Sequence, residues 1–487
     1  MKKIENKVML ITYADSMGSN LKELESALEK YFRGAVKGLH ILPFFPSSGD
    51  RGFAVIEYDR VDPAFGNWSD IDRLAEKYTL AADFMLNHVS IRSAEFQDYM
   101  EKGDASEFRN MFIHWNTFWP NGEPTEEEFN AMYLRRPGGP TKEFTRADGK
   151  VVKLWNTFFA EQVDIDPYAK ATQDYYQRNL GRIAGHVPLI RFDAFAYATK
   201  RPGTSCFFVE PDVWNVLDIA MKPLRDTGTQ MLAEIHENYT IQKKMAERGY
   251  WVYDFALPML LLHSVYSGRT DRLIHWLEIC PRNQYTTLDT HDGIGVVDVA
   301  GLLDDDEIDL VVDNVDRILE PAKPFFPTGY MVRSDGKARR YQMRCTYYSA
   351  LNCNDAAYLL TRAVQFFTPG IPQVYYVGML AGENDIALLR SGGEGRSINR
   401  HNFTLEEIDA AVKKPVVQKL LKLMRFRNDY NVFDGEFSAK LAGGEGSIRM
   451  TWVDGMLRAS LDADFKTLTF RITYADPNTG TDRMLEL

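Results

Sequence analysis

Eight short apolar segments rich in β-formers constrain this fold more than any other feature. They begin at Lys7, Val36, Ala81, His186, Gln230, Trp251, Gln284 and Gly370, and several end in polar residues. Helical patterns lie between several of them, such as 20–32 and 70–78, with Asn20 and Asp70 as the expected N-caps. This alternation predicts an α/β fold, a (β/α)₈ TIM barrel with its chemistry at the carboxyl ends of the strands.

The uneven spacing of the segments predicts two insertions, because the gaps after the third and seventh segments are too long for a simple crossover. After residue 433 the pattern changes to short alternating strands, which predicts a small β domain. The expected organisation is a catalytic barrel at 1–87, 168–292 and 354–433, an insertion at 88–167, a second insertion at 293–353, and a C-terminal β domain at 434–487.

Three local signals sharpen this outline. The acidic run from Asp304 to Glu307 precedes an amphipathic pattern and predicts the first turn of a water-facing helix. Pro415 interrupts a long helical stretch, where we expect a kink or a new start. Asp454 and Gly455 predict a hairpin turn in the C-terminal domain.

Charge and composition exclude several classes of protein. Hydrophobic residues make up 45% and charged residues 26% of the chain, which excludes disordered and fibrous classes. The net charge of −11 disfavours nucleic acid and anionic membranes as partners. The four cysteines are scattered and no run of 18 apolar residues occurs, so we expect a cytoplasmic protein without a zinc site or disulfide framework. The sequence leaves the oligomeric state open.

Three acidic residues stand at the ends of three predicted strands: Asp193, Glu234 and Asp292. In a barrel these ends converge on one mouth. A retaining glycosidase-type reaction needs a nucleophilic carboxylate and an acid/base carboxyl roughly 5 to 5.5 Å apart. We therefore expect Asp193 to attack the anomeric carbon, Glu234 to protonate the leaving oxygen, and Asp292 to stabilise the positive charge of the transition state.

Basic side chains accompany these acids. Arg191 lies two residues before Asp193, on the same strand face, and can hold that carboxylate ionised. His88 and His291 also stand at strand ends, where neutral imidazoles can bind sugar hydroxyls. The chain lacks HExxH, P-loop and GxGxxG motifs, which argues against zinc, nucleotide and nicotinamide chemistry.

Several segments carry a resemblance to a known family. DFMLNHVS, LIRFDAFAY, LAEIHE and TLDTHDG resemble the four signature segments of the α-amylase superfamily, glycoside hydrolase family 13. Longer segments, including ITYADS, LPFFPSSGDRGF, LDTHDGIGVVDV, PGIPQVYYVG and INRH, resemble its sucrose phosphorylase branch. The resemblance extends from about residue 7 to residue 433.

The resemblance implies a retaining phosphorylase with a covalent glucosyl-enzyme, no organic cofactor and no metal. Its substrates would be a small sugar and inorganic phosphate. Asp193, Glu234 and Asp292 keep the roles given above. The glucosyl subsite would contain Asp50, Phe53, His88, Arg191, His291 and Arg400, and the acceptor or phosphate subsite Phe158, Tyr197, His236 and Gln342.

Local basic charge bears on the donor. Residues 329–344 hold five basic residues against one aspartate, and the first insertion adds Arg135 and Arg136. The resemblance implies a phosphate contact for Arg136, and Arg135 matches an arginine of relatives that act on sucrose 6'-phosphate. Arg339 and Arg340 replace part of a segment that helps such enzymes to bind fructose. We therefore expect an anionic acceptor side.

The preferred donor would then be sucrose 6'-phosphate, cleaved to α-D-glucose 1-phosphate and fructose 6-phosphate. Ordinary sucrose phosphorylase is the nearest alternative. Glucosylglycerate or glucosylglycerol phosphorylase and a sucrose hydrolase are more distant ones. A non-catalytic scaffold would be expected to lose the three carboxylates, which this chain retains.

Overall fold

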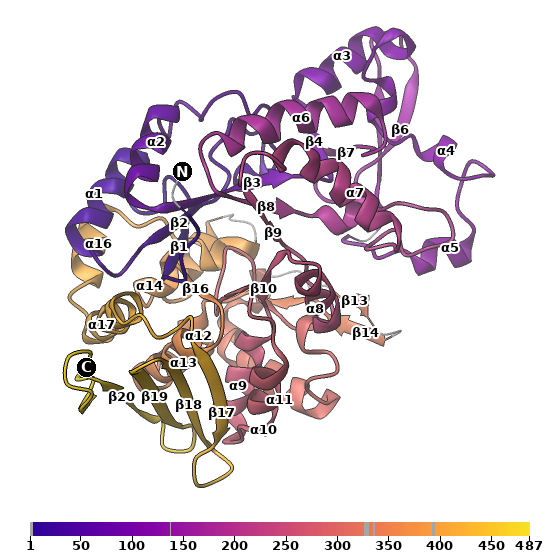
Figure 1. The fold of residues 1–487 in the computed structure, drawn as a ribbon. Coiled ribbons are helices and arrows are strands. Elements are labelled where there is room, and N and C mark those ends of the chain that lie inside the picture. The colour runs from indigo at the N-terminus through magenta and orange to yellow at the C-terminus, as the bar shows by residue number, and fades with distance from the viewer. Residues whose placement is uncertain (1–2, 137, 326–330, 335–336, 392–394) are drawn as a thin grey trace. The chain divides into compact units, whose positions relative to one another are not determined.

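The structure is a computed structural model that describes residues 3–136, 138–325, 331–334, 337–391 and 395–487, with the side chains of 324–339 outside that description. All eight predicted segments form the parallel strands of a closed barrel, hydrogen-bonded in the order β1-β16-β11-β10-β9-β8-β3-β2 (Figure 1). The predicted fold class is confirmed. The strands are β1 (Met9–Thr12), β2 (Gly38–Ile41), β3 (Thr79–Met85), β8 (Leu189–Asp193), β9 (Gln230–Ala233), β10 (Trp251–Asp254), β11 (Gln284–Thr286) and β16 (Ile371–Tyr375).

The chain divides into two compact units. The first contains residues 1–3 and 41–235, and the second contains residues 4–40 and 236–487. Strands β3, β8 and β9 belong to the first unit, whereas β1, β10, β11 and β16 belong to the second. The predicted site residues are therefore distributed over both units, and each group is described within its own unit.

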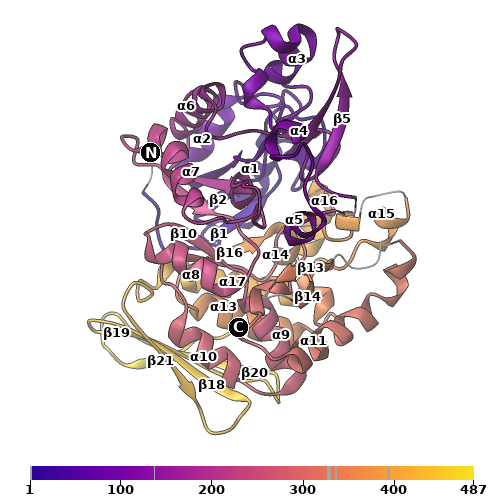
Figure 2. The ribbon, with the colours of Figure 1, turned by 90° about the vertical axis from the view of Figure 1, so that its right-hand side faces the viewer.

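In the first unit, a long excursion between β3 and β8 forms two antiparallel pairs, β4 with β7 and β5 with β6. Trp115, Trp119 and Trp155 pack together in its core. Figure 2 shows β5, α4 and α5 of this excursion. The elements of this unit beyond the barrel strands are α2 (Trp68–Lys77), β4 (His88–Ser90), α3 (Ala94–Lys102), α4 (Trp115–Phe118), α5 (Glu126–Ala131), β5 (Thr141–Thr145), β6 (Val151–Trp155), β7 (Gln162–Asp164), α6 (Lys170–Ala184) and α7 (Asp212–Met221).

In the second unit, helices follow the barrel strands, and a second excursion separates β11 from α13. Helix α11 of that excursion packs against α9, and the pair is visible in Figure 2. The elements are α1 (Leu21–Tyr31), α8 (Tyr239–Glu247), α9 (Leu257–Ser267), α10 (Asp271–Ile279), β12 (Ile294–Gly295), α11 (Asp305–Ile318), β13 (Met331–Ser334), β14 (Lys337–Arg340), β15 (Gln342–Met343), α12 (Tyr347–Ala350), α13 (Asp355–Phe367), α14 (Tyr376–Met379), α15 (Ile386–Arg390), α16 (Leu405–Ala411) and α17 (Pro415–Asp429).

The last part of the chain forms a five-stranded antiparallel sheet, which confirms the predicted C-terminal β domain. Alternate residues face the core: Ile448, Met450 and Trp452 are buried, and the Trp452 indole donates a hydrogen bond to the carbonyl of Phe367 at 2.7 Å. Figure 1 shows this sheet in yellow beside α13 and α17. Its strands are β17 (Glu436–Leu441), β18 (Ser447–Asp454), β19 (Leu457–Asp464), β20 (Thr469–Ala475) and β21 (Asp482–Met484).

Local signals were confirmed with one exception. Asp304 caps α11 and forms a capping box with Glu307, and α17 begins at Pro415. The prediction that Asp70 is an N-cap was wrong. Helix α2 begins earlier, its N-cap is Asn67, and Asp70 is the capping-box residue that accepts the Asn67 backbone N–H. Among the described helices, none is both long and apolar enough to cross a bilayer.

Candidate active site

Strand β8 ends at Asp193, and Arg191 precedes it on the same face of the strand. The Arg191 side chain is 2% exposed. Its Nη1 contacts Asp83 on the neighbouring strand β3 and lies 3.2 Å from Asp193 Oδ1. Its Nη2 lies 3.5 Å from Glu234 Oε1. One buried guanidinium therefore contacts three carboxyl groups of the first unit.

Glu234 follows β9 directly, which places it beside the end of β8. Ala194, the residue after Asp193, has a left-handed backbone with φ +55°, a conformation that is costly for a residue with a Cβ. In this conformation the Ala194 N–H points to Glu234 Oε2 at 3.4 Å. The sharp exit from β8 thus links the backbone beside Asp193 to Glu234.

Asp50, Phe53 and His88 form a second group in the first unit. The Phe53 ring lies under Arg191, with 5.6 Å from the guanidinium carbon to the ring centroid. His88 Nε2 lies 3.2 Å from the carbonyl oxygen of Phe53, and Asp50 Oδ2 accepts a hydrogen bond from Gln162 at 3.2 Å. Burial lowers the pKa of His88 to about 4, so its imidazole is neutral at pH 7.

Phe158 and Tyr197 belong to an aromatic cluster beside His88. Ring centroids are 5.4 Å apart for His88 and Phe158 and 5.0 Å apart for Phe158 and Tyr197. Two residues that sequence reasoning missed complete the cluster. Phe207 packs against Tyr197 at 4.7 Å and stacks on Tyr133 at 4.3 Å. The tyrosine lies in the same YLRR segment as Arg135 and Arg136, a proximity that could have drawn attention to it.

The two arginines of that segment have different surroundings. Arg135 lies over the Phe158 ring, with 5.8 Å from the guanidinium carbon to the centroid. Arg136 instead uses Nη2 to donate to the carbonyl of Thr141 at 3.0 Å and the carbonyl of Asn156 at 2.9 Å. These bonds tie Arg136 to the first residue of β5 and to the residue that follows β6.

Sequence reasoning also missed a buried cation, Lys200. Its ammonium lies 2.8 Å from Asp164 Oδ2, donates to Asn87 Oδ1 at 2.7 Å, and donates to the carbonyl of Tyr197. The Lys200 and Asp164 side chains are 3% and 0% exposed. Burial alone would raise the pKa of Asp164, but Lys200 and the Thr157 hydrogen bonds lower it. The ammonium joins the end of β3, the segment after β8 and strand β7.

In the second unit, Asp292 is surrounded by cationic side chains. Arg396 Nη2 lies 3.0 Å from Asp292 Oδ1, and Arg400 Nη2 lies 3.9 Å from the same oxygen. His291 Nε2 is 3.9 Å from Oδ2. Burial by itself would raise the pKa of Asp292, but Arg396, His291, His236 and Arg400 outweigh it, so this pKa lies well below its ordinary range. Asp292 is therefore a fixed anion at neutral pH.

Arg396 was not among the predicted residues. It lies in a 3₁₀ turn, 395–399, whose sequence reads as an ordinary glycine-rich loop. The same turn presents Asn399, whose amide donates to the Asp292 carbonyl at 2.7 Å, and leads to Arg400, whose Nε donates to the carbonyl of His291 at 2.8 Å. This segment therefore fixes both the backbone and the side chain of the aspartate.

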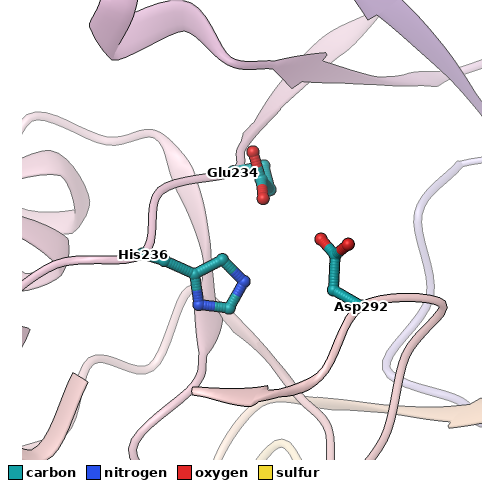
Figure 3. Close-up of side chains that lie close together, drawn as sticks. All are labelled: Glu234, His236 and Asp292. Carbon is teal, nitrogen blue, oxygen red and sulfur yellow. The ribbon is translucent and has the colours of Figure 1, made fainter. Parts of the chain in front are cut away.

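His236 and Gln342 lie in the second unit beside a short ladder between β12 and β15, in which Gly295 pairs with Gln342. The Gln342 amide oxygen lies 3.4 Å from the Gly293 N–H. The His236 ring stacks on Phe255, with centroids 3.9 Å apart, and its Nδ1 lies 3.0 Å from Asp298 Oδ2. Figure 3 shows the His236 ring and the Asp292 carboxylate, together with Glu234.

Within the basic segment before Gln342, β13 pairs with β14 in antiparallel fashion. Arg340 Nη1 lies 2.7 Å from Asp316 Oδ1 on α11. The side chain of Arg339 lies outside the described part of the structure. Glu234, His236 and Asp292 carry atoms of kinds that can bind a cation, but the same groups are those of acid–base chemistry and do not by themselves assign a metal.

These arrangements can be compared with known proteins. The chain is 47% identical to a sucrose phosphorylase from Streptococcus mutans over 97% of its own length and 98% of the relative's. It is 44% identical to a sucrose 6(F)-phosphate phosphorylase from Thermoanaerobacterium thermosaccharolyticum, with 98% of each chain covered. This chain belongs to the sucrose phosphorylase branch of glycoside hydrolase family 13. The predicted family is confirmed, and the chain is an enzyme, a glycosyltransferase of that family.

Solved structures agree with membership in the sucrose phosphorylase branch. The crystal structure of a sucrose 6F-phosphate phosphorylase from Thermoanaerobacter thermosaccharolyticum superposes with a TM-score of 0.94 at 43% identity, covering 100% of this chain and 99% of the other. An α-amylase from H. orenii, 14% identical with a TM-score of 0.66, shares the fold. No protein-family model matches the sequence.

Proposed function

We propose that this chain is a retaining disaccharide phosphorylase that transfers a glucosyl group from sucrose 6'-phosphate to inorganic phosphate. The observation that carries the proposal is the Arg191 guanidinium, which contacts both Asp193 and Glu234. Two carboxyl groups that share one cation at adjacent strand ends suit a double displacement through a covalent intermediate.

In the first step, a carboxylate oxygen of Asp193 attacks the anomeric carbon of the glucosyl group. The bond from that carbon to the fructosyl oxygen breaks, and Glu234 donates its proton to the departing oxygen. In the second step, a phosphate oxygen attacks the same carbon, Glu234 takes the proton of the phosphate, and the ester to Asp193 breaks. Two inversions give α-D-glucose 1-phosphate with net retention.

The remaining groups bind and stabilise the glucosyl unit. Asp292, a fixed anion, stabilises the positive charge that develops on the sugar ring in the transition state. His88, neutral because of burial, offers its imidazole to sugar hydroxyls without adding positive charge near that ring. We assign Asp50, Phe53, Arg191, His291 and Arg400 to the same glucosyl subsite.

The acceptor side takes phosphate and, before it, the leaving group. We assign Phe158, Tyr197, His236, Gln342 and Arg136 to this side. A phosphorylase must exclude water while it admits phosphate, and the cluster of Phe158, Tyr197, Phe207 and Tyr133 offers apolar surface for that purpose.

Arg135 supports a phosphorylated donor. Its guanidinium lies over Phe158, inside the cluster assigned to the leaving group, and an arginine there can bind a phosphate with two parallel hydrogen bonds. The relative and the solved structure that act on sucrose 6F-phosphate match this chain over nearly its full length. Ordinary sucrose phosphorylase is the second candidate, because the relative from Streptococcus mutans carries that activity in its name.

The deciding experiment supplies the purified protein with phosphate and one donor at a time: sucrose 6'-phosphate, sucrose, glucosylglycerol or glucosylglycerate. Release of glucose 1-phosphate is measured, and we expect the fastest release from sucrose 6'-phosphate. Equal or faster release from sucrose would contradict the proposed donor. Glucose release that needs no phosphate would identify a hydrolase instead.

A variant pair tests the role of Arg135. Arg135→Ala is expected to lower kcat/KM for sucrose 6'-phosphate about tenfold or more, since a charged hydrogen bond contributes about 1.5–3 kcal/mol, and to leave sucrose nearly unaffected. For Arg339→Ala, kcat/KM is measured with the same two donors. Arg225→Ala, an exposed arginine of the first unit, is the matched control. Equal losses with both donors would show that Arg135 only stabilises its loop.

A further inference from the structure

A buried carboxylate behind His236 has no place in the chemistry described so far. Asp298 lies in a 3₁₀ turn, 297–299, and its side chain is 0% exposed. Its Oδ2 lies 3.0 Å from His236 Nδ1, and its Oδ1 accepts a hydrogen bond from the Gln242 amide at 3.1 Å. Both carboxylate oxygens therefore have a partner inside the protein.

The contact determines which nitrogen of the His236 ring faces the carboxylate. An ionised carboxylate only accepts hydrogen bonds, so the His236 nitrogen that faces Asp298 carries the proton. The stacking of the ring on Phe255, with planes 16° apart, fixes the second degree of freedom of the side chain. Nε2 is then the ring nitrogen that points away from Asp298, in one defined orientation.

The backbone is built around this pair. A Cβ at Gly295 would lie 2.0 Å from Asp298 Oδ2, a distance that real Cβ atoms essentially never show, and 3.0 Å from His236 Nδ1, which is a tight contact. Gly295 also pairs with Gln342 in the β12–β15 ladder. A side chain at residue 295 would therefore displace Asp298 from the His236 ring. Glycine at this position leaves room for the contact between Asp298 and His236.

The turn that carries Asp298 is itself anchored to the segment after His236. Asn238, two residues beyond the histidine, donates from its side-chain amide to the carbonyl of Ala300 at 2.9 Å, and its side-chain oxygen caps α8. Gln242 on α8 then reaches back to Asp298. Residues 236–242 therefore both carry the histidine and hold the turn that carries Asp298, through Asn238 and Gln242.

We propose that Asp298 is a positioning residue for the acceptor half of the reaction, holding His236 with its proton on Nδ1 so that Nε2 meets the incoming phosphate. This inference rests on the proposed function, because it takes His236 to be part of the phosphate side. It predicts that phosphorolysis depends on Asp298 more than formation of the glucosyl-enzyme does. A carboxylate that only stabilised the fold would affect both half-reactions alike.

The kinetic test uses Asp298→Asn, which keeps the shape and removes the charge, and Gly295→Ala, which displaces the carboxylate without changing it. Both are expected to raise the phosphate KM about tenfold, the change that about 1.4 kcal/mol of lost binding free energy produces. The burst of leaving-group release, which reports glucosyl-enzyme formation, is expected to stay near that of the unchanged protein. Asp309→Asn, an exposed aspartate on α11, is the control.

A second measurement does not depend on turnover. Nitrogen-15 NMR of the histidine rings, with the His236 signals identified by their loss in His236→Gln, is expected to show a protonated Nδ1 in the unchanged protein. Asp298→Asn is expected to shift that signal. A bare Nδ1 in the unchanged protein, an unchanged phosphate KM, or equal losses in both half-reactions would each overturn the proposal.

The two proposals fail in different ways. If no donor yields glucose 1-phosphate, the proposed function fails while the NMR measurement still tests the Asp298–His236 pair. If glucose 1-phosphate is formed but the variants leave its phosphate dependence unchanged, only the role of Asp298 fails.

Discussion

The two units differ in the balance of carboxylates and cations around their candidate site residues. In the first unit, Asp83, Asp193 and Glu234 all contact the single guanidinium of Arg191. In the second, the single carboxylate of Asp292 has Arg396 and Arg400 beside it. Negative charge exceeds positive charge around Arg191, whereas positive charge exceeds negative charge around Asp292.

This difference separates the chemical roles. A cluster with more carboxylates than cations is relieved of repulsion when it takes up a proton, which suits a site that must give and recover one. A carboxylate beside two guanidinium groups keeps its charge throughout the reaction. The acid/base work is therefore expected in the first unit, and the fixed anion in the second.

Asp193→Asn tests the first half of this comparison and carries the largest expected effect. Without the nucleophile, no glucosyl ester forms, and release of glucose 1-phosphate is expected to fall by about 10⁴-fold or more. Asp226→Asn, an exposed aspartate of the same unit, is expected to remain active. Substantial turnover in Asp193→Asn would assign the nucleophile to another residue.

Lys200→Met tests how much the buried ion pair between Lys200 and Asp164 contributes to the stability of the first unit. Removing the ammonium leaves Asp164 buried without its 2.8 Å partner, and such a loss costs about 3–5 kcal/mol of the free energy of unfolding. Urea unfolding measures the change, and Lys222→Met, an exposed lysine, serves as the control. A variant as stable as the unchanged protein would show that the two hydrogen bonds from Thr157 suffice to hold Asp164.

Parts of this picture could be predicted from the sequence because they depend on local patterns. Buried parallel strands are rich in apolar residues, and each barrel strand coincided with one of the eight predicted segments. Asp193 is the last residue of β8 and Glu234 follows β9 directly, whereas Asp292 lies six residues after the end of β11. The N-cap of α2 was misplaced by the same local reasoning, because Asn67 and Asp70 are both good capping residues and only the backbone distinguishes them.

Other parts depend on contacts between distant segments. Arg396 meets Asp292 across 104 positions of the sequence, and Asp298 meets His236 across 62. Neither partner carries a local signal, since a glycine-rich turn and a lone aspartate occur in any loop. Lys200 was missed for the same reason: its oxygen partners come from three separate segments.

Arg396→Met tests the second half of the comparison. Arg396 is the strongest of the cations that lower the pKa of Asp292, so its loss raises that pKa toward the ordinary range. The active form is the carboxylate, so activity is then lost at a higher pH as the solution is made acidic. We expect the acidic limb of the rate profile to move to higher pH and kcat to fall by about tenfold for each 1.4 kcal/mol of transition-state stabilisation that is lost.

We would measure kcat as a function of pH for the unchanged protein and for Arg396→Met and compare the two profiles. Arg390→Met, an exposed arginine just before the same segment, is the matched control. A fall in kcat without movement of the acidic limb would show that Arg396 holds the loop and does not act on the charge of Asp292.

Arg340→Ala has the smallest expected effect and compares the two basic segments. Arg135 lies over an aromatic ring, whereas the positive charge of Arg340 is matched by Asp316 at 2.7 Å. A guanidinium already paired with a carboxylate has less charge to offer a phosphorylated donor, so its loss is expected to change kcat/KM for sucrose 6'-phosphate by only about two- to threefold, as for a partly exposed ion pair. The ratio of kcat/KM between sucrose 6'-phosphate and sucrose measures it. A loss of selectivity as large as that of Arg135→Ala would mean that Arg340 leaves Asp316 and binds the donor phosphate during the reaction. In that case Asp316→Asn would be expected to strengthen the preference for the phosphorylated donor.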